Sequence, residues 1–401
     1  MYAQLAIVAA FVFAFSLIAG RIDRSPLSGP MIYVAFGLVM GPAGLGVFTL
    51  SFDTEALRTL AELALAVVLF TGAANAELSV LGKTYKLPAR LLLIGLPLTI
   101  LAGFGVGVVF FRDLSVFELV ILATMLAPTD AALGKAVVEN KAVPSHIREG
   151  LNVESGLNDG ICVPILFVFL ALATHANTEG STLDLAVRLI VEEIGIGLVV
   201  GLGLTLLGAW LLKLCGERGW ITDVWVQVPV GALSLTCFAV AQMLGGSGFI
   251  AAFSGGLLLG ALAKDQKARL VRAAEGTAEK LALLTWVVFG SAVVGRALGS
   301  FSLPVLGYAL LSLTLVRMVP VALSVIGLRL HASSTLFLGW FGPRGLASIV
   351  FGIIVVNANL PGGGTVTAVV VATITMSVLL HGITAYPLSI AYGRAMRRST
   401  P

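Results

Sequence analysis

Long runs of residues without a charge constrain this chain more than any other feature of its sequence. Three examples are residues 5–18, 91–111 and 194–212, which have the length and character of segments that cross a hydrocarbon core of ~30 Å. Only 11% of the 401 residues are charged, whereas a soluble domain has about 25%. In lipid the backbone satisfies its hydrogen bonds only in helices or closed barrels, and the runs lack the alternating polarity of barrel strands. We therefore expect an all-α polytopic membrane protein.

Charged and Gly/Pro-rich breaks divide the apolar runs into thirteen expected transmembrane helices. The division between the eighth and ninth, at Gly245-Gly246-Ser247, is the least marked. The expected spans cover residues 2–19, 28–47, 54–73, 88–111, 117–138, 147–174, 186–214, 223–244, 247–263, 279–298, 303–328, 333–357 and 364–392.

The basic residues of the connecting loops predict how these spans are oriented. One set of alternate loops holds nineteen of the 25 Lys and Arg residues, and the other set holds four. Because cytoplasmic loops carry the excess of Lys and Arg, we expect a multi-pass protein of the cell's inner membrane, with its N-terminus outside and its C-terminus in the cytoplasm. The net charge of +4 follows from these loops and does not indicate nucleic acid as a partner.

Two of the spans contain a proline near their middle. Pro128 lies in the segment 127–130 of span five, and Pro343 lies in the segment 342–345 of span twelve. Proline removes a backbone donor and clashes with the preceding turn, so both helices should be broken there. Spans seven apart cross in opposite directions, so pairing spans 1–6 with 8–13 gives an inverted-topology repeat. Paired broken helices of this kind are typical of secondary transporters; the alternative is two ordinary kinked helices.

Each break also carries an ionisable residue. The N-terminus of a half-helix has partial positive charge and the C-terminus partial negative charge. We expect Asp130 to offset the N-terminal charge at one break and Arg344 to offset the C-terminal charge at the other.

Span six contains the densest group of polar residues at membrane depth. Glu154 and Asn158 are four residues apart, as are Ser155 and Asp159, and this spacing places each pair on one helix face. Carboxylate, hydroxyl and amide oxygens are hard ligands that suit an alkali cation. We expect residues of broken span five to complete the site, namely Thr129 and Asp130.

The two carboxylates of span six need partners, because buried ionisable residues are costly in a membrane. Arg317 of span eleven and Arg344 of span twelve are the two basic residues that the loops do not account for. We expect one of them, Arg317 by preference, to pair permanently with Glu154, which leaves Asp159 to bind either a proton or a cation. His381, inside span thirteen, is expected to be a packed residue and not a pH sensor.

These motifs resemble those of the sodium–proton antiporters of the NhaP and NHE type, the electroneutral branch of the monovalent cation–proton antiporters. The Glu-Ser-x-x-Asn-Asp-Gly segment at 154–160 is the most specific part, and the resemblance extends over essentially the whole chain. It implies a homodimer in which a core moves like an elevator against a dimerisation scaffold. The core would comprise spans 4–6 (88–174) and 11–13 (303–392), and the scaffold spans 1–3 (2–73) and 7–10 (186–298).

The resemblance also implies roles for individual residues. Asp159 would bind Na⁺ and the proton, with Thr129, Asp130 and Ser155 helping to coordinate the cation. Asn158 occupies the position of a second aspartate in electrogenic relatives. Glu154 would pair with Arg317. The family usually has a proline after the Thr-Asp pair, where this chain has Ala131, so the break in span five should depend on Pro128.

The sequence thus predicts an antiporter that exchanges Na⁺ or Li⁺ for H⁺, one for one, in contact with membrane lipid and without a cofactor beyond the transported ions. A K⁺/H⁺ antiporter of the same fold is the first alternative, because both cations bind in oxygen cages. The alternative from another class is an intramembrane aspartyl protease that uses Asp130 and Asp159, but it gives the broken helices no role. A channel would need a continuous polar lining, which the sequence lacks.

Overall fold

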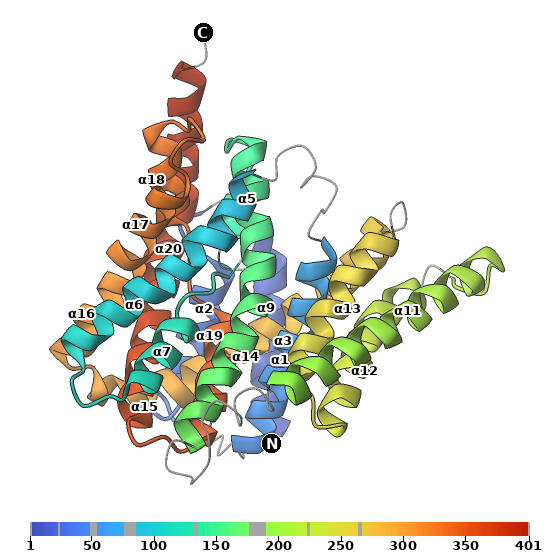
Figure 1. The fold of residues 1–401 in the computed structure, drawn as a ribbon, viewed down its shortest axis with the longest axis horizontal. Coiled ribbons are helices and arrows are strands. Elements are labelled where there is room, and N and C mark those ends of the chain that lie inside the picture. The colour runs from blue at the N-terminus through green and yellow to red at the C-terminus, as the bar shows by residue number, and fades with distance from the viewer. Residues whose placement is uncertain are drawn as a thin grey trace.

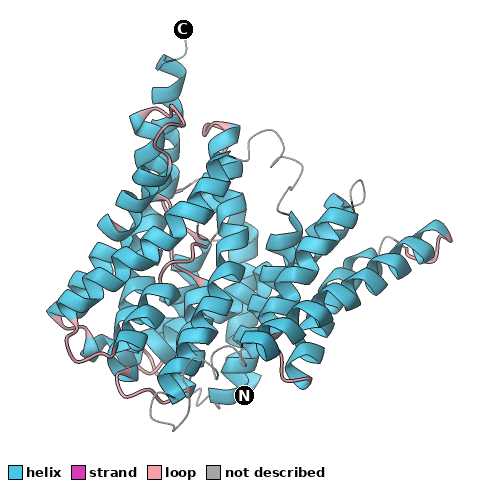
Figure 2. Cartoon of the chain, in the orientation of Figure 1, coloured by secondary structure: helices cyan, strands magenta, loops and turns pink. Residues whose placement is uncertain are grey.

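The computed structural model describes residues 2–22, 25–48, 54–75, 86–130, 133, 135–138, 140–175, 190–222, 225–263 and 267–399. These residues form helices joined by turns and short extended segments, with no strand among them (Figures 1 and 2). The elements are α1 (Tyr2–Ile22), α2 (Gly29–Met40), α3 (Thr54–Asn75), α5 (Lys86–Arg90), η1 (Leu91–Gly95), α6 (Leu96–Phe110), α7 (Val116–Met125), α8 (Lys135–Val138), α9 (Ser145–His175), η2 (Ile190–Ile194), α11 (Gly195–Glu217), η3 (Trp225–Gln227), α12 (Pro229–Met243), α13 (Gly248–Leu262), α14 (Lys267–Val288), η5 (Phe289–Val294), α15 (Gly295–Ala297), η6 (Leu298–Ser300), α16 (Leu303–Leu313), α17 (Leu315–Ser324), α18 (Ala332–Trp340), α19 (Leu346–Asn357) and α20 (Gly363–Ser399).

Each of the thirteen expected spans has a helical counterpart in the described parts of the chain. Eight of these helices are long and apolar enough to cross a membrane, and five are shorter apolar helices. The division between spans eight and nine is confirmed, because α12 ends at Met243 and α13 begins at Gly248. The all-α membrane fold is confirmed, while the count of thirteen complete crossings stays a prediction.

Both predicted breaks are confirmed. In span five, α7 ends at Met125 and residues 127–130 are not helical, so the second half begins only with α8. In span twelve, residues 341–345 separate α18 from α19. The described helix of the second half of span five is α8, which has four residues. Ala131 lies outside the described residues.

Span eleven contains an interruption that the sequence analysis did not predict. Its two helices, α16 and α17, are separated at Thr314, whose φ of −112° and ψ of −96° are not helical. The Thr314 hydroxyl donates to the carbonyl oxygen of Leu310 at 2.7 Å, and hydroxyl bonds of this kind to the preceding turn often bend helices. Arg317 lies in the first turn of α17, directly after this interruption.

The long helix α9, which carries the polar group of span six, packs against the centre of the molecule through glycines. A Cβ on Gly156 would lie 3.0 Å from the carbonyl oxygen of Gly72 in α3, so two backbones meet there. A Cβ on Gly160 would lie 2.2 Å from the ring of Phe253 in α13. Gly156 therefore allows two helix backbones to approach closely, and Gly160 makes room for an aromatic ring.

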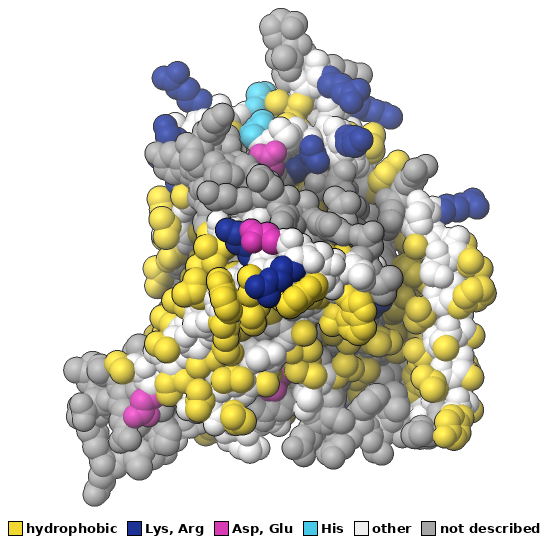
Figure 3. All heavy atoms as spheres, turned by 90° about the vertical axis from the view of Figure 1, so that its right-hand side faces the viewer, with side chains coloured by type: hydrophobic (Ala, Val, Ile, Leu, Met, Phe, Trp, Pro, Cys, Tyr) yellow, Lys and Arg dark blue, Asp and Glu magenta, His cyan; other side chains and the backbone are white. Residues whose placement is uncertain are grey.

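The outer surface of the helices is apolar, as a membrane protein requires. Exposed large side chains include Leu17, Val199 and Trp210, which are 69%, 73% and 58% exposed. Figure 3 shows apolar side chains over much of one face, with the visible Lys and Arg side chains in its upper and central parts. In Figure 1 the C-terminus, α5 and α18 lie at one end of the molecule, and the N-terminus and α15 lie at the other.

Candidate functional site

The two broken helices meet at their non-helical segments. The backbone N–H of Asp130 donates to the carbonyl oxygen of Pro343 at 2.8 Å. A second link is made by Ser348 of α19, whose hydroxyl donates to the carbonyl oxygen of Met125 at 2.7 Å. The non-helical segments of spans five and twelve, residues 127–130 and 341–345, thus meet inside the protein, and we call this meeting point the crossing. Non-helical backbone is tolerated at membrane depth when it is buried in protein in this way.

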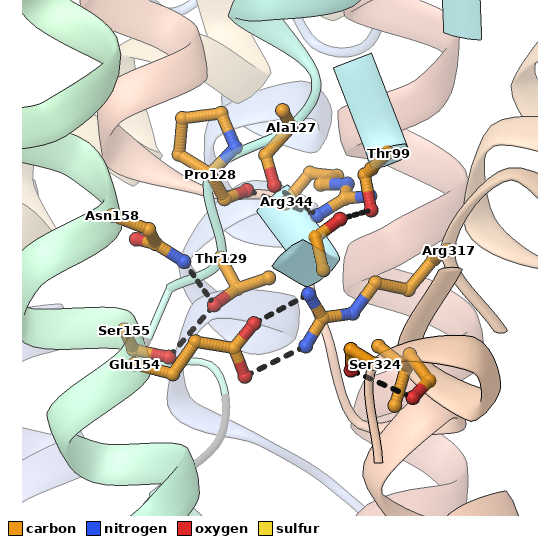
Figure 4. A network of polar contacts seen from close by, with 12 residues as sticks. Thr99, Ala127, Pro128, Thr129, Glu154, Ser155, Asn158, Arg317, Ser324 and Arg344 are labelled. Carbon is orange, nitrogen blue, oxygen red and sulfur yellow. Dashed lines mark hydrogen bonds and ion pairs between the residues drawn. The ribbon is translucent and has the colours of Figure 1, made fainter. Parts of the chain in front are cut away.

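The charge of each broken helix compensates the end of the other one. Leu346 is the first residue of α19, and its backbone N–H donates to Oδ2 of Asp130, from span five, at 2.8 Å. Arg344, from span twelve, donates through Nη1 to the carbonyl oxygens of Ala127 and Pro128 at 2.8 and 3.1 Å, directly after the end of α7 (Figure 4). These contacts follow the rule that anions suit helix N-termini and cations C-termini. Each charged side chain thus compensates an end of the other broken helix, so this arrangement depends on how the two spans pack together.

Two glycines make the crossing possible by leaving room for charged side chains. A Cβ on Gly345 would lie 1.8 Å from Oδ2 of Asp130, and a Cβ on Gly342 would lie 2.5 Å from Nε of Arg317. Neither glycine has a positive φ, so each is required for space and not for its backbone conformation.

Thr129 links the first break to α9. Its hydroxyl lies 2.8 Å from the Ser155 hydroxyl, and it accepts the Asn158 side-chain amide at 2.8 Å (Figure 4). Thr129 and Asn158 are buried at 2% and 0% exposure. The structure thereby brings three of the predicted site residues into one hydrogen-bonded group.

Glu154 and Arg317 form a bidentate ion pair. Nη1 and Nη2 of the arginine donate to Oε1 and Oε2 of the glutamate at 2.5 and 2.8 Å (Figure 4). Both side chains are 1% exposed. Arg344 was the other candidate partner of Glu154, but its guanidinium is directed to the carbonyls at the end of α7. Planar, bidentate contacts are the strongest form of this interaction.

Asp159 lies beside these groups without a comparable counter-charge. It is 8% exposed, and among the described residues its Oδ1 has no hydrogen-bond partner. Oδ1 of the neighbouring Asn158 is likewise unbonded. The hydroxyls of Thr129 and Ser155 contact each other, and within the described part of the chain no hydrogen bond joins either of them to Asp159. Two acceptor oxygens therefore lie free next to the crossing, and oxygens of this type suit an alkali cation.

Two contributors to the crossing were not identified in the sequence. Ser377 and His381 of α20 are buried and hydrogen-bond to both sides of the break in span twelve. Their spacing of four residues indicates that both lie on one face of a helix, but it does not reveal which element that face contacts.

Comparisons with known proteins agree on one family. Residues 7–391 match the family described as sodium/hydrogen exchanger, transmembrane. The chain is 23% identical over 379 residues to the K(+)/H(+) antiporter NhaP2 of Shewanella sp. strain ANA-3, covering 93% of this chain and 65% of that protein. It is 23% identical over 388 residues to the K(+)/H(+) antiporter NhaP of Alkalimonas amylolytica, covering 96% and 66%. The chain thus spans about two thirds of the length of these curated relatives.

The fold is also similar to a solved structure. The sodium proton antiporter MjNhaP1 from Methanocaldococcus jannaschii, in a structure at pH 8, is 22% identical to this chain, with a TM-score of 0.75. The match covers 98% of this chain and 100% of that one. At this level of identity the similarity shows a shared fold.

Proposed function

From the premise that the chain belongs to the sodium/hydrogen exchanger family, we propose that it is an antiporter that exchanges Na⁺ or Li⁺ for H⁺, one for one. It acts as a multi-pass protein of the inner membrane. Members of this family and the structural neighbours are transporters and not enzymes.

The balance of buried charges at the crossing carries this proposal. The site contains two arginines, Arg317 and Arg344, and three carboxylates. Arg317 neutralises Glu154 directly, and Asp130 and Arg344 compensate each other's helix ends. Asp159 is the one carboxylate left over, so the site carries one negative charge when empty and none when it holds one proton or one monovalent cation.

This balance gives a mechanism for obligatory exchange. An ionised, empty Asp159 is costly to move through the hydrocarbon core, whereas the loaded site is neutral and crosses. A proton and a cation compete for the same carboxylate, so neither leaves unless the other replaces it. Thr129, Asp130, Ser155 and Asn158 supply oxygens around the cation, and the Glu154–Arg317 pair stays intact throughout the cycle.

The moving part is the core of spans 4–6 (88–174) and 11–13 (303–392), and spans 1–3 (2–73) and 7–10 (186–298) form the scaffold of a homodimer embedded in lipid. The location of both breaks and all site residues in the core supports this division. The N-terminus faces outside and the C-terminus the cytoplasm. The opposite positions of the termini in Figure 1 and the positive-inside rule support that orientation.

A K⁺/H⁺ exchanger is the second candidate, and a specific observation favours it. Both curated bacterial relatives described above are named as K(+)/H(+) antiporters. The oxygen ligands of the site are compatible with either cation. The aspartyl protease is set aside, because it gives the two broken helices no role and the family of this chain consists of transporters.

The test is a cation-driven change of internal pH in vesicles that contain only this protein, measured with Na⁺, Li⁺ and K⁺. Wild-type protein should exchange at least one of the three. Asp159→Asn, which keeps the shape but cannot take up a proton, should abolish exchange with all of them while remaining folded by gel filtration. A folded Asp159→Asn variant with the wild-type rate would contradict the proposal.

A further inference from the structure

His381 and Ser377 of α20 form a hydrogen-bonded bridge across the break of span twelve. Nε2 of His381 lies 2.9 Å from the carbonyl oxygen of Trp340, the last residue of α18. Nδ1 of His381 lies 3.1 Å from the Ser377 hydroxyl, which accepts the backbone N–H of Arg344 at 2.7 Å. The bridge therefore begins on the C-terminal carbonyl of α18 and ends on the backbone of the charged residue beyond it.

The partner of Nε2 places a proton on that nitrogen of the imidazole. Trp340 offers a carbonyl oxygen, which can only accept, so Nε2 must carry a proton. The Ser377 hydroxyl already accepts from Arg344 and has one proton to give, which Nδ1 accepts when it is unprotonated. Nδ1 also lies 3.1 Å from the backbone carbonyl oxygen of Ser377, so its contacts leave the proton on that nitrogen open. In the neutral tautomer that lacks the Nε2 proton, two lone pairs would face each other at Trp340.

The surroundings of the imidazole are buried, aromatic and cationic. His381 is 1% exposed, and the charged groups that act on it, Arg344 and Arg317, are both cations. Trp340 and Phe341 pack against the imidazole from α18 and the break, with ring centroids at 5.2 and 6.5 Å. An added positive charge on the ring would have no carboxylate to face among these groups.

We propose that His381 is a positioning residue, which holds the break of span twelve against α20 as a neutral hydrogen-bond bridge and so keeps Arg344 on the end of α7. This rests on the proposed antiport function for its transport consequence only. The bridge holds the backbone of Arg344, and the Arg344 side chain donates to the carbonyl oxygens of Ala127 and Pro128. These two residues directly precede Thr129, which belongs to the proposed cation site. His381 then affects cation binding through geometry and not through titration.

The test compares two pairs of variants in reconstituted vesicles, well below the melting temperature of each. His381→Gln keeps a donor for Trp340, whereas His381→Leu has similar bulk and no donor. Ser377→Ala removes the bridging hydroxyl, and Ser389→Ala is its matched control. Ser389 is equally buried on α20, but among the described residues its hydroxyl bonds only to the carbonyl oxygen of Ala385 in the same helix.

A leucine side chain cannot donate to Trp340, and an alanine cannot bridge to Arg344. His381→Leu and Ser377→Ala should therefore raise the apparent KM for the cation and lower the rate, on the order of tenfold, as small misplacements of reacting groups do. His381→Gln and Ser389→Ala should keep the wild-type KM, and His381→Gln should also keep the wild-type pH profile. A wild-type KM and rate in folded His381→Leu would overturn the proposal. So would a displaced pH profile in His381→Gln, because that would show that the imidazole titrates.

Hydrogen–deuterium exchange tests the bridge without any transport. The amides of residues 341–346 should exchange faster in His381→Leu and Ser377→Ala than in wild type, and at the wild-type rate in Ser389→Ala. Unchanged exchange in both bridge variants would contradict the positioning role. Absence of cation–proton exchange in the wild type would instead contradict the antiport function, and the amide exchange would still decide the role of His381.

Discussion

Two carboxylate side chains five residues apart on α9, those of Glu154 and Asp159, have different surroundings, and this difference defines the site at the residue scale. Glu154 is held by both guanidinium nitrogens of Arg317, while Asp159 has an oxygen without a partner among the described residues. The proposed mechanism assigns the exchangeable charge to Asp159 and a structural role to the Glu154–Arg317 pair.

The ion pair should be essential for stability. Glu154→Ala or Arg317→Ala leaves an unpaired charge at 1% exposure, which costs roughly 3–5 kcal/mol in soluble proteins. Each single variant should melt at a clearly lower temperature, and the double variant should lose less than the sum of the two. A double-mutant cycle by thermal unfolding in detergent measures this coupling.

The exposed pair Lys213–Glu217 is a suitable control for that cycle. Its atoms lie 3.9 Å apart and its side chains are 76% and 64% exposed, so the same substitutions should show no measurable coupling. Zero coupling between Glu154 and Arg317 would show that the buried pair is not a unit.

At the scale of elements, the crossing depends on helix ends that meet closely. Gly345→Ala would place a methyl group 1.8 Å from Oδ2 of Asp130, so either the carboxylate or the start of α19 must move. We expect this single methyl to reduce exchange severely. Gly105→Ala in α6 is the control, because nothing lies within 4 Å of a Cβ there, and it should transport like wild type. The rate of cation-driven pH change in vesicles measures both, and normal transport by Gly345→Ala would contradict the crossing.

The sequence predicts a helix break only where the residues at the break themselves indicate it. Pro128 and Pro343 each lie close to an ionisable residue in the middle of an apolar span, and this combination predicted both breaks. Proline alone is not enough, since Pro164 and Pro387 lie inside the continuous helices α9 and α20. The interruption at Thr314 was not predictable, because the same hydroxyl bond to the preceding turn occurs at Thr71 and Thr373 inside continuous helices.

The contacts of the crossing are harder to predict than the breaks. Sequence predicts that Asp130 and Arg344 compensate helix ends, but not that each one serves the other helix, since this depends on how the spans pack. The same holds for Ser377 and His381, whose partners Arg344 and Trp340 lie 33 and 41 residues away, in the break of span twelve and at the end of α18. The choice of Arg317 over Arg344 for Glu154 agrees with the geometry, and the functional roles of the site residues stay predictions.

At the scale of the whole molecule, competition at one carboxylate predicts how transport depends on pH. Lowering the pH on the cation-binding side fills Asp159 with protons, so the apparent KM for the cation should rise as the pH falls. The rise should approach about tenfold per pH unit once the site is mostly protonated, by linkage of two ligands at one site. Initial rates over a series of cation concentrations and pH values measure this, and a KM independent of pH would mean that the proton and the cation bind separately.

The central claim is that one exchangeable charge, on Asp159, sets a stoichiometry of one proton per cation. Its most direct test is cation-driven pH change in vesicles whose membrane voltage is clamped with K⁺ and valinomycin at zero and at −100 mV, with Na⁺ or Li⁺ as the substrate. The cation gradient that just balances a fixed pH difference should be the same at both voltages. One net charge moved across 100 mV corresponds to about 2.3 kcal/mol, so a shift of the balancing gradient by well over tenfold would show that a second carboxylate titrates and would contradict the account.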